Sequence, residues 1–389
     1  METNIPFIHL KSQYASIREE VEAGIHKVLE RQSFILGDEV KEMEELIARL
    51  HNCAHGVGCA SGSDALLLSL LALGIGPGDK VIVPSFTFFA TAGSVVRAGA
   101  TPVFVDIDPR TMNISPSTVE QALADHDQKD IIKAIIPVHL YGQCADMDRL
   151  LSLAKQHSLP VVEDAAQSIL ARYGGRPAGS MGNCGCLSFF PTKNLGGAGD
   201  GGMILTNDSK LAELLHLLRD HGARERNFHI LAGINSRLDT LQAAVLLTKA
   251  KHLPGWTEQR QQKAAFYQKL FLGAGICDPD AVYPTAKFPV VLPYTQPGNY
   301  HVFNQYTLRV ARRKEMADYL ASHGIGTAIY YPLPLHRQPV FSCLNYANDA
   351  CPESERAASE VLSIPIYPEL SDEQQAQVTG CINKFYSSR

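Results

Sequence analysis

Residues 161–197, VVEDAAQSILARYGGRPAGSMGNCGCLSFFPTKNLGG, contain two short β-rich runs separated by glycine-rich turns. The runs 161–163 and 187–189 have the length and the flanking residues that predict strands. Asp164 directly follows the first run, and Lys193 lies in the glycine-flanked loop after the second. In doubly wound α/β folds the carboxyl ends of the strands face the ligand crevice. This stretch therefore predicts a sheet with chemically active side chains at the strand ends.

Further β-rich runs alternate with helical segments on both sides of this stretch, at 56–59, 81–83, 103–105, 134–138 and 203–205. Such alternation predicts an α/β fold with a mostly parallel sheet sandwiched by helices. Before it, residues 17–50 carry apolar residues at helical spacing, and 33–37 interrupt them as a loop. From about Lys251 the rhythm fades into a helix with Trp256, a strand-like run at 306–310 and a proline-rich segment. We expect a large α/β domain in 1–250 and a smaller α+β domain in 251–389.

The composition excludes several classes of protein. Hydrophobic residues make up 45% of the 389 and charged residues 19%, which is typical of a folded globular chain. The net charge of −5 argues against a nucleic-acid surface. Nine scattered cysteines show neither a disulfide framework nor paired metal-ligand spacing, so we expect no metal site. The N-terminus lacks a secretory pattern, and no apolar run approaches the ~18 residues of a membrane span, so we expect a cytoplasmic protein.

The segment ASGSDA at 60–65 feeds an apolar helical run, and a small-residue turn at a helix N-terminus favours a phosphate group. Gly62 and Ser63 are the candidates there, although an ordinary helix cap explains the pattern too. Asp164, with Gln167 three residues later, is placed to pair with a protonated pyridine nitrogen. The alternative for Asp164 is a helix N-cap.

Lys193 lies among apolar and small residues, an unusual neighbourhood for a lysine. A lysine amine can form a Schiff base with an aldehyde cofactor when burial makes it nucleophilic. The nearby segment GAGDGG at 197–202 matches a dinucleotide-binding pattern. It leads into the run 203–205 rather than opening a helix, so we exclude a nicotinamide or flavin site.

Nearly end to end, the chain resembles the DegT/DnrJ/EryC1/StrS family of sugar aminotransferases, within the fold-type I enzymes that use pyridoxal phosphate (PLP). The order and spacing of the matching segments carry the resemblance: IPFIHLK at 5–11, FILG at 34–37, SGSDAL at 61–66, VPSFTFFAT at 83–91, EDAAQS at 163–168, SFFPTKN at 188–194, GDGG at 199–202, NSRLD at 235–239 and YYPLPLH at 330–336.

This resemblance implies a role for each matching residue. Lys193 would bind PLP covalently and later move protons, Asp164 would meet the pyridine nitrogen, and Gln167 would reach the ring hydroxyl. Gly62, Ser63 and Ser188 would hold the phosphate. Phe88 would lie against the ring, unless it only packs in the core. Asn235 would reach the partner subunit's cofactor, which implies a homodimer with composite active sites.

The resemblance also implies a ping-pong transamination, in which an amino acid, usually glutamate, gives its nitrogen to a nucleotide-linked keto-sugar. The segments 136–146 and 235–244 are most similar to members that aminate carbon 3, such as the enzyme acting on UDP-2-acetamido-3-keto-glucuronate in bacterial polysaccharide assembly. Candidate substrate contacts are Arg237, Tyr331 and His336. Arg237 equally suits a structural ion pair with an acid. Ile234 and 169–170 depart from the family pattern, which leaves the shape of the pocket open there.

Three other functions remain as alternatives. The first is a keto-sugar aminotransferase acting at carbon 4. The second is a sugar dehydratase of the same fold, which in this family carries histidine in place of Lys193. The third is a non-catalytic PLP-binding sensor, which normally has an added module that this chain lacks the length to contain.

Overall fold

The computed structural model describes residues 4–125, 131–347 and 349–387. Its central sheet has the order β3 (Thr101–Val105), β2 (Lys80–Pro84), β4 (Ile132–Ile135), β5 (Val162–Asp164), β8 (Cys184–Ser188), β9 (Gly202–Thr206) and β1 (His55–Cys59). Parallel bridges from Ile135 to Val161 and from Val138 to Asp164 join β4 to β5. Within this sheet β9 runs antiparallel to β8 and β1, while the other ladders are parallel. The predicted mostly parallel α/β sheet is confirmed.

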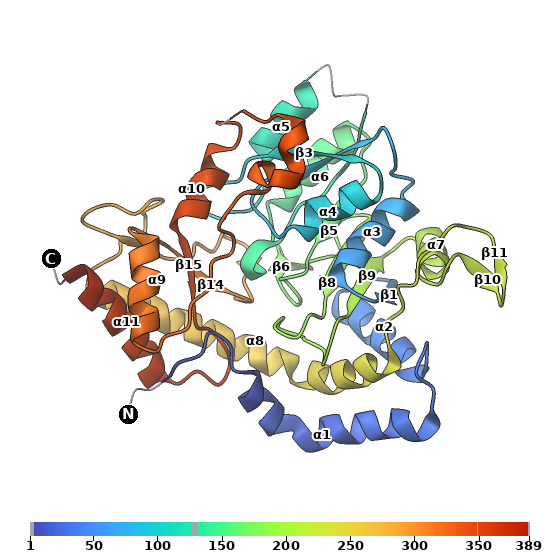
Figure 1. Ribbon diagram of the computed structural model, residues 1–389, viewed down its shortest axis with the longest axis horizontal. Helices are drawn as coiled ribbons and strands as arrows, with labels where there is room; N and C mark the ends of the chain where they lie inside the picture. The colour runs from blue at the N-terminus through green and yellow to red at the C-terminus, as the bar shows by residue number, and fades with distance from the viewer. Residues whose placement is uncertain (1–3, 126–130, 348, 388–389) are drawn as a thin grey trace.

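Helices cover both faces of this sheet (Figure 1). One face packs against α3 (Gly62–Ala72), α4 (Ala90–Arg97) and α7 (Ser209–Arg219). The other packs against α2 (Asp38–Leu50), α5 (Pro116–Ala124), α6 (Met147–Gln156) and the first half of α8 (Thr240–Ala274). Helix α3 is apolar nearly all round, so it is buried on all sides. Its N-terminus is thereby fixed at the edge of the sheet.

The predicted N-terminal helix pair is also present. Helix α1 (Leu10–Arg31) and α2 flank the loop at 33–37, as expected. Ile17 and Val21 of α1 pack against Val245 and Trp256 of α8, so α1 lies along α8 at the bottom of Figure 1.

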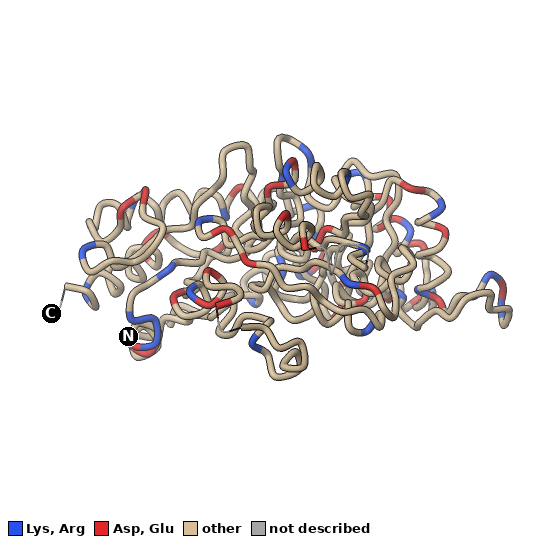
Figure 2. The backbone as a smooth tube through the Cα atoms, turned by 90° about the horizontal axis from the view of Figure 1, so that it is seen from above, with Lys and Arg blue, Asp and Glu red and all other residues tan. Residues whose placement is uncertain are grey.

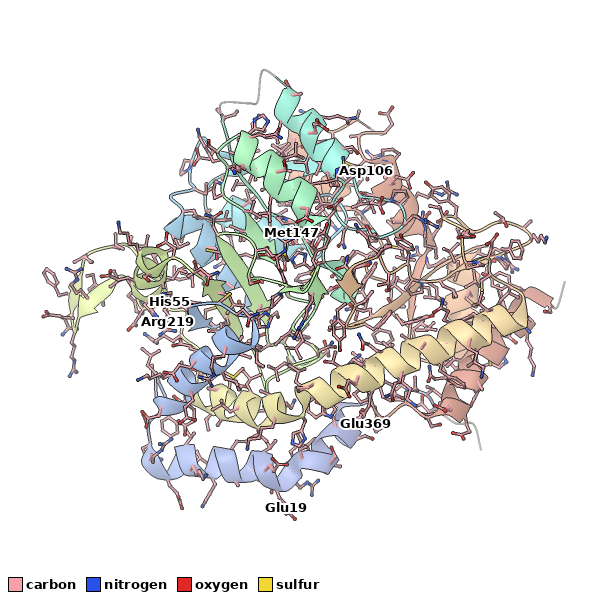
Figure 3. All side chains as sticks on the ribbon, turned by 180° about the vertical axis from the view of Figure 1, so that it is seen from behind. Glu19, His55, Asp106, Met147, Arg219 and Glu369 are labelled. Carbon is pink, nitrogen blue, oxygen red and sulfur yellow. The ribbon has the colours of Figure 1, made fainter. Side chains whose placement is uncertain are left out.

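A second core contains β14 (Tyr306–Val310) between β12 (Val290–Val291) and β15 (Val361–Ile364), with α9 (Arg313–Ser322) and α11 (Asp372–Ser387). Asp106, labelled in Figure 3, attaches helix α10 (Pro352–Glu360) to the first core. Its carboxylate accepts hydrogen bonds from the N–H groups of Glu353 and Ser354 at 2.8 Å. Other short elements are β6 (Arg172–Tyr173), β7 (Arg176–Pro177), β13 (Asn299–Tyr300), η1 (Leu140–Gly142), η2 (Leu335–Arg337) and η3 (Pro339–Leu344).

The expected domain boundary at 250/251 falls inside the continuous helix α8. The first half of α8 packs on the large core and its second half, with Tyr267 and Phe271, packs on the second core. Ile5 also belongs to the second core rather than to the large one, because its N–H donates to the carbonyl of Gly324. The helix continues through Pro254, so the change of packing partner occurs without a break in the helix.

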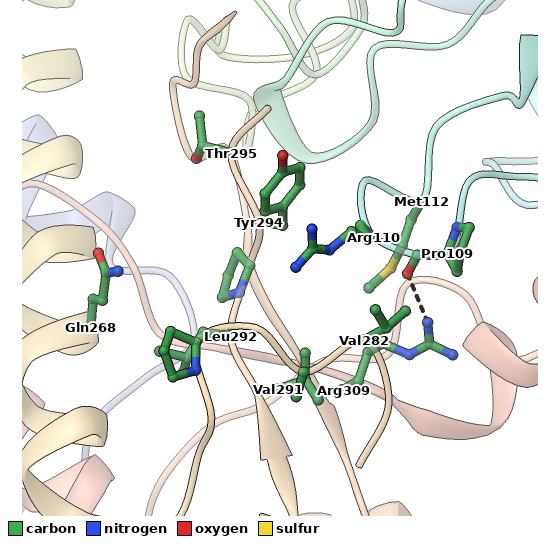
Figure 4. Close-up of a pocket in the computed structure, with 13 residues that line it drawn as sticks. Pro109, Arg110, Met112, Gln268, Val282, Val291, Leu292, Tyr294, Thr295 and Arg309 are labelled. Atoms are coloured by element: carbon green, nitrogen blue, oxygen red, sulfur yellow. Dashed lines mark hydrogen bonds between the residues drawn. The ribbon is translucent and has the colours of Figure 1, made fainter. Parts of the chain in front are cut away.

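A cavity of about 240 Å³ marks the seam between the two cores (Figure 4). Arg110 lies across it, stacks on the ring of Tyr294 and donates to the carbonyl of Asp280. Arg309, from the second core, donates to the carbonyl of Pro109 at 2.8 Å. Both arginines therefore join the walls of this cavity, and its lining includes no lysine or carboxylate.

A hairpin of β10 (Ala223–Glu225) and β11 (Phe228–His229) projects from the large core (Figures 1 and 2). Its Phe228 is 61% exposed. No helix in the described parts of the chain combines the length and apolar character needed to cross a membrane.

Candidate active site

A cavity of about 410 Å³ opens beside the ends of the central strands. Its lining comes from the start of α3, the loops after β2, β5 and β8, and the second core. Of the residues predicted to form the site, it brings together Gly62, Ser63, Phe88, Asp164, Gln167, Ser188, Tyr331 and Lys193. The cavity is also lined by residues that the sequence analysis did not name as site residues: Ser61, Thr87, Asp200, Gln305 and Tyr330.

Lys193 sits on the turn after β8, where its N–H donates to the carbonyl of Phe190 at 2.9 Å. Burial lowers the pKa of Lys193 to about 8, and the nearby carboxylate of Asp164 acts in the opposite direction. A sizeable fraction of this amine is therefore neutral near neutral pH, and a neutral amine is nucleophilic.

Asp164 ends β5 and is nearly buried. One carboxylate oxygen accepts a hydrogen bond from Thr91 Oγ1 at 2.7 Å and the other from the N–H of Ala166 at 3.2 Å. Burial raises the pKa of Asp164, while these hydrogen bonds and Lys193 favour the ionised form. A cationic group in the cavity would offset the desolvation of this carboxylate.

Gln167 follows in the loop after β5, and both ends of its amide are bound. Its Oε1 accepts from the N–H of Tyr141 at 2.6 Å, and its Nε2 donates to Tyr331 Oη at 3.1 Å. Thr91 and Tyr141 were not predicted for this site. Their roles depend on contacts 73 and 26 residues apart along the chain, which no local pattern indicates.

The N-terminus of α3 forms a narrow cradle at the edge of the cavity. Ser61 caps the helix, because its side chain accepts from the N–H of Asp64. A Cβ added to Gly62 would lie 2.7 Å from Ser188 Cβ, and one added to Gly202 would lie 2.4 Å from the carbonyl carbon of Ser61. Only glycine fits at these two positions. N–H groups at the start of a helix attract anions.

Phe88 is 56% exposed and lines the cavity, with its ring centroid 6.0 Å from that of Tyr331. Its neighbour Phe86 is 1% exposed. Core packing therefore describes Phe86, whereas Phe88 is available to lie against a planar ligand.

Three predicted residues do not line the cavity: Asn235, Arg237 and His336. Asn235 is exposed on the strand-like segment that pairs with Asp220. Arg237 forms an ion pair with Asp220 at 2.5 Å, which is the structural alternative considered for it. His336 is buried, with Nδ1 2.5 Å from Ser85 Oγ and Nε2 3.2 Å from Glu355. Both ring nitrogens of His336 are therefore engaged by the protein, and its contact with substrate stays a prediction.

The residues that line the cavity fit PLP. The buried amine of Lys193 suits its aldehyde, the desolvated carboxylate of Asp164 suits a pyridinium nitrogen, and the Gly62 cradle suits a phosphate. The segment 197–202 precedes β9 and opens no helix, which agrees with the exclusion of a dinucleotide site.

The model of the "DegT/DnrJ/EryC1/StrS aminotransferase family" matches residues 15–383. A "Pleiotropic regulatory protein" of Geobacillus stearothermophilus is 50% identical, over 98% of this chain and 99% of that protein. A "UDP-2-acetamido-2-deoxy-3-oxo-D-glucuronate aminotransferase" of Pseudomonas aeruginosa is 42% identical, over 94% and 96%. The crystal structure of S. venezuelae DesV in complex with a ketimine intermediate superposes with a TM-score of 0.91 at 40% identity, covering 98% of each chain.

Proposed function

Because the chain belongs to the DegT/DnrJ/EryC1/StrS aminotransferase family, whose members depend on PLP, we propose that it transfers an amino group from L-glutamate to carbon 3 of a nucleotide-linked keto-sugar. The observation that carries this proposal is the pairing of Lys193 and Asp164 in one cavity, in a chain 42% identical to a 3-oxo-sugar aminotransferase. The product would be an amino sugar for a surface polysaccharide or a related glycan.

Each residue contributes a separate part of the chemistry. PLP supplies an electron sink for the negative charge that develops on a substrate carbon. Lys193 would hold the cofactor, and its Nζ would then carry a proton between the substrate carbon and the cofactor, because it remains within reach of both. Asp164 would keep a proton at the pyridine nitrogen. Phe88 would lie against one face of the ring, and the Gly62 cradle would anchor the phosphate.

The test is a comparison of substrates. Purified protein with L-glutamate would be offered a UDP-linked 3-keto-sugar and a nucleotide-linked 4-keto-sugar, with 2-oxoglutarate and the amino sugar measured by mass spectrometry. We expect kcat/KM for the 3-keto-sugar to exceed that for the 4-keto-sugar by at least ~100-fold, about 3 kcal/mol of transition-state binding. The reverse preference would assign the chain to the carbon 4 alternative, and Lys193→Ala is the inactive control.

A homodimer with composite active sites is the second part of the proposal. Two features support it: Asn235 is exposed outside its own cavity, and the nearby hairpin exposes Phe228, Ile230 and Leu231. Apolar side chains grouped on a projecting segment are typical of an interface. If Asn235 completes the partner's site, mixing inactive Lys193→Ala protein with inactive Asn235→Ala protein should restore activity. Random exchange of subunits makes about half of the dimers mixed, and each mixed dimer has one intact site of two. About a quarter of the activity should therefore return. No recovery after subunit exchange would contradict composite sites.

The 50% identical relative favours a second candidate, a PLP-binding regulator, through its name alone. A regulator needs cofactor binding but no turnover, so the substrate comparison separates the two. The dehydratase alternative is disfavoured by Lys193, which occupies the cavity where that reaction uses histidine.

We place the reaction in the cytoplasm, in keeping with the nine cysteines, all of which are free thiols.

A further inference from the structure

The orientation of the Gln167 amide follows from its partners. The N–H of Tyr141 can only donate, so the atom 2.6 Å from it is the amide oxygen. The amide nitrogen is then the atom that lies 3.1 Å from Tyr331 Oη, and it must donate. One proton of the amide group is used in this bond, and its second proton remains available to the cavity.

Tyr331 Oη therefore acts as an acceptor toward Gln167, and its own proton is free to donate elsewhere. Burial, followed by the nearby carboxylate of Asp164, raises the pKa of Tyr331, so the hydroxyl stays protonated at neutral pH. Tyr331 lines the cavity, and its ring is fixed by the rings of Phe86 at 6.2 Å and Phe88 at 6.0 Å. A fixed ring directs this O–H donor into the same space as Gln167.

Tyr141 connects this pair to both cores. Its backbone has φ of 60°, a left-handed conformation that a tyrosine rarely adopts. Its carbonyl accepts from the N–H of Asn304 at 2.9 Å, and its hydroxyl donates to the carbonyl of Tyr330. These bonds hold the segment that carries Tyr331 against the large core, where Tyr331 Oη lies within hydrogen-bond distance of Gln167 Nε2.

We propose that Tyr331 is a positioning residue for the cofactor: it fixes the Gln167 amide and donates its own hydroxyl proton to the acceptor that Gln167 reaches, the ring oxygen of PLP. This inference rests on the proposed PLP-dependent function. It replaces the expected contact of Tyr331 with the sugar. Two donors stabilise the anionic form of that oxygen, because hydrogen bonds to a charged form favour it.

The test is the pH dependence of the visible absorption of the PLP-bound protein. In Tyr331→Phe, loss of one donor should raise the pH of the spectral transition by about one unit, a tenfold change in proton affinity. The dissociation constant for PLP should rise by about tenfold as well. Tyr300→Phe removes a hydroxyl from an exposed tyrosine outside the cavity and should leave both values unchanged. Circular dichroism establishes that each variant is folded.

A second variant tests the link between the two residues. In Gln167→Glu the side chain can only accept from Tyr331, so the hydroxyl proton turns away from the cavity and the transition should again rise. Adding Tyr331→Phe to Gln167→Glu should then change little, since the donor is already lost. A further full shift in the double variant would contradict the coupling.

The remaining outcomes are also decisive. If Tyr331→Phe leaves the spectral transition unchanged and raises KM for the sugar, Tyr331 is a substrate contact and the proposal is overturned. If the unaltered protein binds no PLP, the proposed function itself fails, which is a different result from an unchanged transition in a yellow protein.

Discussion

The low pKa of Lys193 makes the loading of cofactor strongly pH dependent. Only a neutral amine attacks the aldehyde of PLP, and the pKa of Lys193 is lowered by burial to about 8 from an ordinary 10.5. At about pH 7.5 roughly a quarter of this amine is neutral, against about one part in a thousand for an exposed lysine. The neutral fraction is thus raised by about two hundredfold.

The sign of the pH effect follows from this direction of shift. Loading should accelerate as pH rises, reach half its maximum near pH 8, and then level off. Asp164 raises the pKa of Lys193, so Asp164→Asn should move the half-maximum to lower pH. The two side chains have nearly the same shape, so the variant changes mainly charge.

The assay is stopped-flow absorbance after mixing cofactor-free protein with a small excess of PLP, at pH values from about 6 to about 10. A control is Lys263→Ala, which removes a lysine that pairs with Asp372 outside the cavity. A half-maximum near the ordinary lysine pKa, or an upward shift in Asp164→Asn, would refute the reasoning.

Three further variants test single features of the site. Gly62→Ala should weaken PLP binding by at least tenfold, because its Cβ would lie 2.7 Å from Ser188 Cβ, and an unchanged affinity in a PLP titration would argue against the cradle. Arg237→Ala should leave KM for the nucleotide sugar nearly unchanged, because Arg237 lies outside the cavity, and should lower the free energy of unfolding in urea by no more than about 1 kcal/mol, since its pair with Asp220 is partly exposed; a tenfold higher KM would instead support a substrate contact. His336→Ala should lower the free energy of unfolding by about 1–3 kcal/mol with little change in KM, and the opposite pattern would restore a substrate role.

The sequence predicts the parts of this protein that depend on local pattern. The alternation of short apolar runs with helices is sufficient to predict the sheet. Because β5 and β8 run parallel, Asp164 at the end of β5 and Lys193 after β8 reach the same edge. Gly62 is predicted from its place in a small-residue turn before an apolar run, and the close approach of Ser188 explains why glycine is required there. Strand ends and tight turns depend on residues that are neighbours in the chain, so they can be predicted from a single sequence.

The parts that could not be predicted depend on distant contacts. The residues around Thr91 in the sequence do not indicate its hydrogen bond to Asp164. Those around His336 do not indicate that its Nδ1 lies within hydrogen-bond distance of Ser85, 251 residues earlier. The assignment of Asn235 to a partner subunit rests on resemblance, since a local pattern contains no information on a second chain. Helix α8 packs on both cores, so the division between them falls inside one helix rather than at a loop.

The central claim is that Lys193 holds PLP and that the cofactor accepts nitrogen from an amino acid. The most direct measurement is the visible absorption spectrum of the purified protein and of Lys193→Ala, before and after adding L-glutamate. We expect a yellow protein whose visible band bleaches with glutamate, and a Lys193→Ala protein in which that band is absent. A visible band that persists in Lys193→Ala, or one that no amino donor bleaches, would contradict the account.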